Sequence, residues 1–278
     1  MLSRSSLIRG FLPFLLVVAV SAPAVAGGGI PLATYRAVHD LVLDPSVDTG
    51  DISTVTGRLV TEFKGSECAG YTTTTRFVTE SVDGDGNRQV VDARSVSIEK
   101  PDGSFQFDNQ TYEDGKLTES AKGTATRKGG AVRVNIKDPE KKVLTLDADV
   151  AFPNEQIVRS LEAGRAGERF VDMKSYDGLD NGETVSPTTV ILGAGSTDPS
   201  DVGDEAPIAD AGFATMQHWP VTITYFDPDK GVDQAPDYSM SAILYDNGIM
   251  RRLRLDYGDF ALLGTLVRLD VLPQPACP

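Results

Sequence analysis

Two cysteines carry the most reactive side chains of this sequence, and their positions limit the chemistry they could do. Cys68 lies in the stretch GSECAGY, and Cys277 lies in QPACP at the other end of the chain. A redox pair usually lies close in sequence, as Cys-x-x-Cys, in a basic environment that lowers a thiol pKa. Here Glu67 precedes Cys68, and no His, Lys or Arg adjoins either cysteine. The pattern favours one structural disulfide over a reactive thiol or a redox pair.

The two histidines, His39 and His218, are too few for a three-histidine zinc site. His39 falls on an otherwise apolar face of a predicted strand, which favours a partly buried histidine with one hydrogen bond over a functional residue. His218 precedes Trp219 and Pro220 at the entrance of another strand and is a candidate for a pocket rim. No catalytic, cofactor-binding or metal-ligating residue is predicted, no cofactor is expected, and the ligand-binding residues are unknown.

The remaining motifs are weak. Residues 83–87, DGDGN, begin like a calcium-binding EF-hand loop, but Arg88 and Arg94 stand where that loop needs Gly and Glu, so a hairpin loop is favoured. The stretch GAGS at 193–196 lacks the third glycine and the lysine of nucleotide-binding loops. The 40 acidic residues offer many carboxylate pairs for glycoside hydrolysis, but no pair stands out. A hydrolase is therefore the weakest functional hypothesis.

The first 26 residues have the pattern of a secretory signal peptide. Arg4 and Arg9 form a basic head, residues 11–20 are an unbroken apolar run, and Ala24 and Ala26 fit the small-residue cleavage positions. We expect cleavage after Ala26, which leaves residues 27–278 as a single soluble domain without a transmembrane segment. The alternative is an N-terminus that stays anchored in the membrane.

The charge balance excludes one class of partner. The chain has 26 basic and 40 acidic residues, a formal net charge of −14. A nucleic-acid-binding protein needs a basic face that displaces counterions from phosphate, so no nucleic-acid partner is expected. Strong binding to an anionic membrane surface is equally disfavoured.

Period-two alternation through most of the chain predicts strands joined by short turns. Asn247-Gly248 marks a hairpin between strands at 239–245 and 250–257. Leu253, Leu255 and Tyr257 share one face of its second strand; they could line a concave apolar surface or be ordinary core, and core is favoured. The last strand, near 263–271, is apolar on both faces, which predicts a central place in the sheet rather than an edge.

One segment has helical spacing instead. We expect a helix near 154–165, with Asn154 as its N-cap and Gly164 and Gly167 at its end. Residues 194–217 predict an irregular surface loop with a short helical turn. The fold class is mainly all-β: a long antiparallel sheet curled into an open barrel, with the helix covering an end or filling part of the interior.

Several blocks of this sequence resemble the EipB family of periplasmic cell-envelope integrity proteins, formerly a domain of unknown function. The matching blocks follow the family's order: YRAVHDLVL from Tyr35, GRLVTEFKGSECAGYTTTTRFV from Gly57, FPNEQIVRSLEAGRAGERFVDMKSYDG from Phe152, WPVTITYF from Trp219 and YSMSAILYDNGIMRRLRLDYGDFALLGTLVRLDVLP from Tyr238. Residues 194–217 depart from the family pattern, so the resemblance implies no role for that loop.

The resemblance implies a β-spiral closed by a disulfide between Cys68 and Cys277, and no enzymatic activity. It also implies a periplasmic location, a role in maintaining the envelope of Gram-negative alphaproteobacteria under stress, and a functional association with a periplasmic tetratricopeptide-repeat protein. The leading hypothesis is thus a non-enzymatic periplasmic protein that binds a protein partner or an envelope component. The alternatives are a lipid or acyl-chain carrier, because the curled sheet resembles lipoprotein carriers, and an envelope hydrolase. Self-association through exposed sheet edges stays open.

Overall fold

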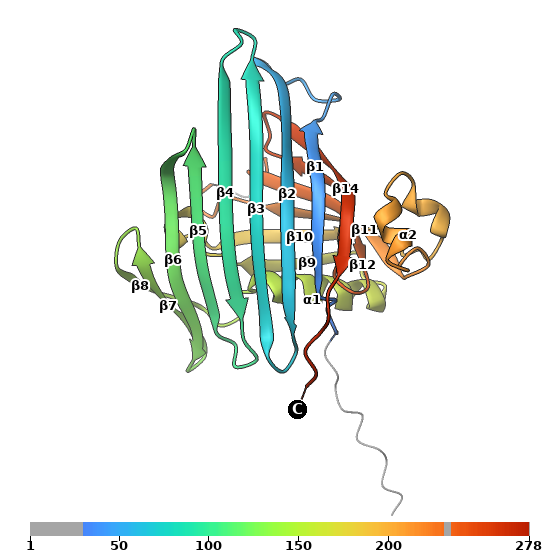
Figure 1. Ribbon diagram of the computed structural model, residues 1–278. Helices are drawn as coiled ribbons and strands as arrows, with labels where there is room; N and C mark the ends of the chain where they lie inside the picture. The colour runs from blue at the N-terminus through green and yellow to red at the C-terminus, as the bar shows by residue number, and fades with distance from the viewer. Residues whose placement is uncertain (1–29, 231–234, 278) are drawn as a thin grey trace, which may run out of the picture.

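The computed structural model describes residues 30–230 and 235–277, which form one antiparallel sheet of 14 strands (Figure 1). The predicted signal peptide, residues 1–26, lies outside the described residues. In space the strand order is β8-β7-β6-β5-β4-β3-β2-β1-β14-β13-β12-β11-β10-β9. The strands are β1 Tyr35–Leu43, β2 Ile52–Ser66, β3 Gly70–Asp83, β4 Arg88–Glu99, β5 Phe105–Glu113, β6 Lys116–Lys128, β7 Ala131–Asp138, β8 Lys142–Asp147, β9 Phe170–Ser175, β10 Ser186–Leu192, β11 His218–Tyr225, β12 Tyr238–Tyr245, β13 Met250–Asp256 and β14 Ala261–Val271.

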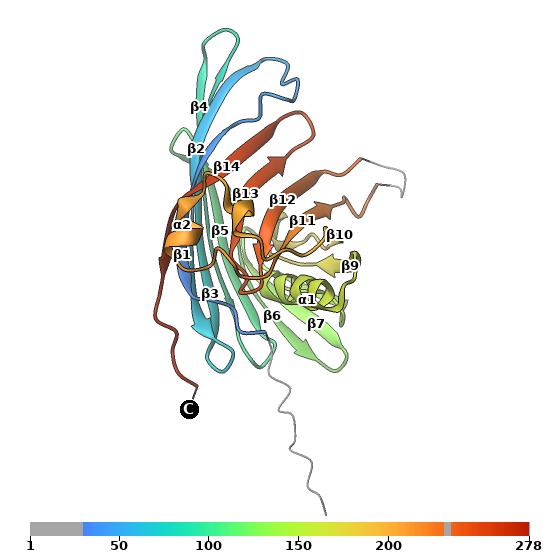
Figure 2. The same ribbon diagram turned by 90° about the vertical axis from the view of Figure 1, so that its right-hand side faces the viewer.

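Two meanders, β1 to β8 and β9 to β14, share this sheet because the first strand pairs with the last. Tyr35 of β1 lies opposite Val271 of β14, and the pairing continues to Leu43 and Leu262. The prediction that the last strand is central is confirmed, since β14 lies between β1 and β13. The sheet curls without closing, and β8 and β9 form its two edges (Figure 2). The predicted fold class is therefore confirmed.

Helix α1, Pro153–Ala166, connects the two meanders and packs against the inside of the curl. Asn154 is not its N-cap, contrary to the prediction: Phe152 occupies that position and Pro153 is the first helical residue. The physical reason is that proline has no N–H to leave unsatisfied and its fixed φ already suits a first turn. The helix ends at Gly167, whose φ of 76° is the left-handed conformation that glycine adopts freely.

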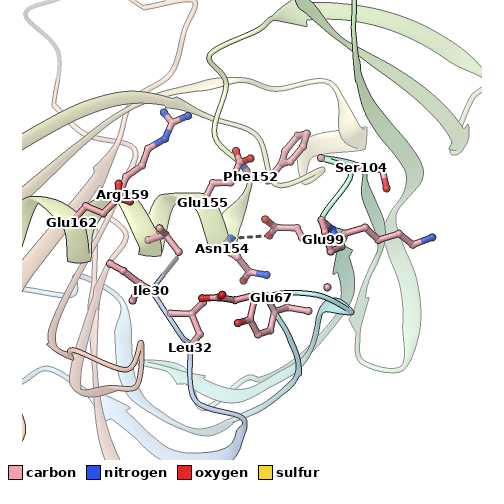
Figure 3. Close-up of a pocket in the computed structure, with 16 residues that line it drawn as sticks. Ile30, Leu32, Glu67, Glu99, Ser104, Phe152, Asn154, Glu155, Arg159 and Glu162 are labelled. Atoms are coloured by element: carbon pink, nitrogen blue, oxygen red, sulfur yellow. Dashed lines mark hydrogen bonds between the residues drawn. The ribbon is translucent and has the colours of Figure 1, made fainter. Parts of the chain in front are cut away.

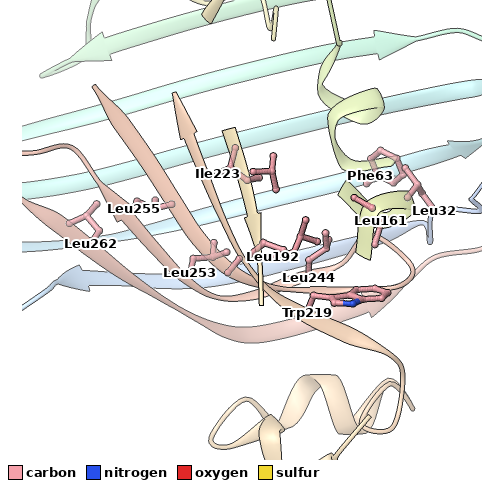
Figure 4. Close-up of a cluster of buried hydrophobic side chains, with 14 of the residues drawn as sticks. Leu32, Phe63, Leu161, Leu192, Trp219, Ile223, Leu244, Leu253, Leu255 and Leu262 are labelled. Carbon is pink, nitrogen blue, oxygen red and sulfur yellow. The ribbon is translucent and has the colours of Figure 1, made fainter. Parts of the chain in front are cut away.

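The main core lies between α1 and the strands β11 to β14 (Figure 4). Leu161 and Ala163 from the helix meet Trp219, Leu244 and neighbouring aliphatic side chains. A second cluster joins β5 to β7 with the segments that flank α1; its aromatic members are Phe105, Phe107, Phe152 and Tyr176. Among the described residues, no helix is long and apolar enough to cross a membrane.

Residues 194–217 contain the predicted short helical turns, as the 3-10 helix η2 (Pro199–Val202) and the helix α2 (Ala206–Asp210). The segment is more than a surface loop, because Val202 and Ile208 are buried against β1, β12 and β14. The third short helix, η1, spans Asp180–Gly182 between β9 and β10.

A disulfide joins Cys68, in the turn between β2 and β3, to Cys277 beyond β14. Their Cα atoms are 5.7 Å apart, a usual separation for bridged cysteines. The bond ties the end of the chain to the turn after the second strand and thereby holds the seam between β1 and β14.

Candidate functional site: a cavity inside the curled sheet

The inside of the curl contains a cavity of about 410 Å³, bounded by the inner faces of the strands and by the start of α1. Its lining separates into two walls of different chemistry. The first wall, on β2 to β5, presents hydroxyl and amide groups: Thr61, Thr73, Thr75, Ser95, Ser97 and Asn109. The second wall, from α1 and β11 to β13, is apolar: Ile157, Ile223, Met240, Met250 and Leu253.

Strand register builds the polar wall. Thr61 lies opposite Thr75, Thr75 opposite Ser95, and Ser95 opposite Asn109, so one row crosses four strands. Directly opposed residues share one face of a sheet, and the row therefore faces the cavity as a unit. A parallel row runs Phe63, Thr73, Ser97 and Phe107, with an aromatic ring at each end.

Four of these hydroxyls are free to meet a ligand. Within the described chain, Thr61, Thr73, Thr75 and Ser97 make no hydrogen bond through their side chains. Ser95, in contrast, donates to Oδ1 of Asn109 at 2.6 Å. The row of hydroxyls thus keeps donors and acceptors that no protein group uses.

His39 lines the cavity and is only 4% exposed. Its Nε2 donates to the carbonyl oxygen of Met250 at 3.3 Å, and its Nδ1 is buried without a partner in the described chain. Burial lowers the pKa of His39, which favours the neutral ring. The single hydrogen bond of the favoured interpretation is confirmed, but the residue is fully rather than partly buried, and it also lines the cavity.

Charge is nearly absent from the cavity lining. Asp177 is the one ionisable carboxyl among the described lining residues, and no Lys or Arg is among them. Burial raises the pKa of Asp177, and the backbone N–H of Leu179 donates to its Oδ1 at 2.9 Å. Beside it, Gln156 of α1 donates to the hydroxyl of Tyr225 and accepts from Ser175. The cavity is therefore polar on one side but close to uncharged.

A second cavity of about 480 Å³ lies on the other side of the start of α1 (Figure 3). Glu99 of β4 is buried in it, and the Glu99 Oε1 accepts the backbone N–H of Asn154 at 2.7 Å. Desolvation raises the pKa of Glu99 to about 8, against the opposing effect of that hydrogen bond. The charged side chains Lys100, Arg159 and Glu162 also line this cavity.

The structure separates the residues that the sequence singled out. His218 is buried at the start of β11, its Nδ1 2.9 Å from the carbonyl oxygen of Met216, and it lines neither cavity. Leu253 lines the first cavity, Leu255 is core, and Tyr257 is 37% exposed and stacks on Phe260.

The DGDGN stretch forms the β3–β4 hairpin loop. The carboxylate of Asp83 accepts the backbone N–H groups of Asp85 and Asn87 there.

The hydroxyl wall was missed from the sequence. The run TTTT at 72–75 indicated a strand, and alternation would have placed Thr73 and Thr75 on one face. Nothing local showed that this face lines a cavity, because the opposite wall comes from β11 to β13.

Comparisons with known proteins agree with this architecture. The sequence profile of the family described as EipB-like matches residues 26–273. The chain is 36% identical over 249 residues to the "Cell envelope integrity protein EipB" of Brucella abortus (strain 2308), covering 89% of this chain and 87% of that protein. A crystal structure titled "Beta-barrel-like Protein of Domain of Unknown Function DUF1849", also from Brucella abortus, aligns with a TM-score of 0.81 at 35% identity. That alignment covers 88% of this chain and 100% of the other.

Proposed function

The chain belongs to the EipB-like family, and on that premise we propose that it is an exported, non-enzymatic protein that supports cell-envelope integrity by binding an envelope component inside its curled sheet. Export with cleavage after Ala26 and residence in the periplasm are part of this proposal. They are supported by the name of the Brucella relative and by the disulfide, since disulfides persist in oxidising compartments.

The observation that carries the proposal is the cavity between the hydroxyl wall and the apolar wall. Its volume falls in the range of about 300–1,000 Å³ typical of small-molecule sites. A binding role rather than catalysis is supported by how its histidine is used: His39 donates to a backbone carbonyl and, within the described chain, makes no hydrogen bond to a serine or cysteine that it could activate. A periplasmic tetratricopeptide-repeat protein stays a proposed partner on the family resemblance alone.

A deletion strain tests this function. Loss of the gene should sensitise cells to detergents and to antibiotics that act on the cell wall, and the wild-type gene should restore resistance. Thr75→Phe would fill the cavity and should fail to restore it. Thr74→Phe is the matched control, because Thr74 is the adjacent residue on the exposed face of β3 and should restore resistance fully. Unchanged sensitivity of the deletion strain would contradict the envelope role, and restoration by Thr75→Phe would contradict the cavity as its site.

A carrier of lipids or acyl chains is the second candidate function. The apolar wall favours it, because Met240, Met250 and Leu253 offer a flexible aliphatic surface to a chain. Native mass spectrometry on protein purified gently from a periplasmic extract checks it. An apolar molecule that co-purifies and leaves on denaturation supports the carrier, and a protein that binds no apolar molecule at all contradicts it.

A further inference from the structure

We infer that the cavity inside the sheet takes an uncharged amphiphile whose polar end carries hydroxyl groups. The inference rests on the proposed function and names the chemistry of the ligand. It depends on two independent properties of the lining: the absence of Lys and Arg among its described residues, and the division into a hydroxyl wall and an apolar wall.

The charges of the lining select the head group of the ligand. An anionic head group entering this cavity would find no Lys or Arg among the described lining residues and would meet Asp177 instead. Moving an unpaired charge out of water is far more costly than moving a hydroxyl. Free fatty acids at neutral pH and phospholipids are therefore disfavoured. A neutral polar head carries no such penalty.

The two walls define the shape of the preferred molecule. The free hydroxyls of Thr61, Thr73, Thr75 and Ser97 lie on neighbouring strands, which run about 4.8 Å apart. A polyol head can bond several of them at once. The apolar wall opposite suits a hydrocarbon body and would leave hydroxyls on that side unpaired. The cavity thus matches a molecule with one hydroxylated side and one aliphatic side.

Calorimetric titration with a matched pair of probes tests the inference. The probes are 1-lauroylglycerol and sodium laurate, which share one acyl chain, titrated at pH 7.5 below their aggregation concentrations. The neutral probe should bind the full mature protein and the carboxylate should bind at least tenfold more weakly. Thr75→Val removes one hydroxyl and keeps the shape, so it should weaken the neutral probe by roughly three- to tenfold, the usual range for one hydrogen bond.

Thr74→Val, on the opposite face of β3, is the control and should bind the neutral probe like the wild type. Equal binding of both probes, tighter binding of laurate, or no loss in Thr75→Val would overturn the inference.

Failure here is distinguishable from failure of the proposed function. If the deletion strain is sensitive and Thr75→Phe does not restore resistance, but 1-lauroylglycerol does not bind, the cavity is needed and the ligand chemistry is wrong. If the deletion strain is not sensitive and the neutral probe binds as described, the ligand chemistry stands and the envelope role is wrong.

Discussion

Glu99, at the end of β4, accepts the backbone N–H of Asn154 at 2.7 Å and so caps a helix that begins far along the chain. The first turn of a helix leaves N–H groups without intrahelical partners. Phe152 at the N-cap position has no oxygen in its side chain to accept them, and Glu155 folds back to the N–H of Phe152 instead. The buried carboxyl therefore fixes the start of α1 against the sheet, at Asn154, which lines both cavities.

The pKa of Glu99 predicts a pH-dependent stability. Burial raises that pKa from 4.5 to about 8, so the folded protein holds a proton that the unfolded chain has lost between those pH values. The contribution to the free energy of unfolding is fully present below about pH 4.5 and is lost as pH rises through about 8. Glu99→Gln keeps the accepting oxygen and cannot titrate, so its stability should fall less between pH 5 and pH 8, by up to a few kcal/mol.

Denaturant unfolding at both pH values measures this difference. Glu162→Gln, exposed on the same helix, is the control and should keep the wild-type pH dependence. If the free energy of unfolding changed with pH in the same way for Glu99→Gln and for the wild type, the buried carboxyl of Glu99 would not be the cause of the pH dependence.

The contact between α1 and Trp219 predicts a position where alanine destabilises a helix. A Cβ on Gly164 would lie 2.9 Å from Cε2 of Trp219, closer than real contacts allow. Alanine is otherwise the better helix former by about 1 kcal/mol. We expect Gly164→Ala to lower the free energy of unfolding by about 1–3 kcal/mol, as overpacked cores do. Gly84→Ala, where the nearest heavy atom is 3.8 Å from a Cβ, is the control, and a stabilised Gly164→Ala would contradict the packing.

The disulfide should contribute strongly to stability, because the loop it closes spans 209 residues. In the chain-entropy account, a loop of this length stabilises the folded state by about 5 kcal/mol, as an upper value. We expect Cys68→Ser and Cys277→Ser to lose similar amounts, and the double variant to lose no more than either. Denaturant unfolding of the wild type with and without a reductant checks this. A reduced wild type as stable as the oxidised one would refute it.

The buried ion pair between Arg251 and Glu205 should hold the 194–217 segment in place. Arg251 is fully buried, its Nη1 lies 3.0 Å from Glu205 Oε2, and Glu205 Oε1 accepts the backbone N–H groups of Arg252 and Leu266. Removing one partner leaves a buried charge unpaired. Arg251→Met should therefore cost about 3–5 kcal/mol.

Amide hydrogen exchange shows which part of the chain is destabilised in Arg251→Met. Amides of the 194–217 segment should exchange faster in Arg251→Met than in the wild type. Arg268→Met breaks the exposed pair with Asp270 and is the control, with an expected cost below about 1 kcal/mol. If the amides of this segment exchanged at the wild-type rate in Arg251→Met, the packing of Val202 and Ile208 alone would be enough to hold the segment in place.

Much of the architecture could be predicted from local pattern. Alternation located the strands, and the two-faced apolar character of the last strand predicted its central place. The helix was found by its spacing, but its first residue was misjudged, because Asn154 is a good capping residue and its backbone N–H instead meets Glu99. No rule about neighbouring residues could have indicated that acceptor on β4.

The strands, the turns and the helix depend on residue types within a few positions of one another, so local pattern was enough to predict them, and the export signal stays a prediction of the same kind. Which side chains meet depended on the tertiary structure. His39 lies in one cavity with Thr75 because β1 to β4 pair in register, and the apolar wall faces them because β1 pairs with β14 and the sheet curls. Curl and register are set by the whole sheet at once, and the chemistry of the cavity follows from them.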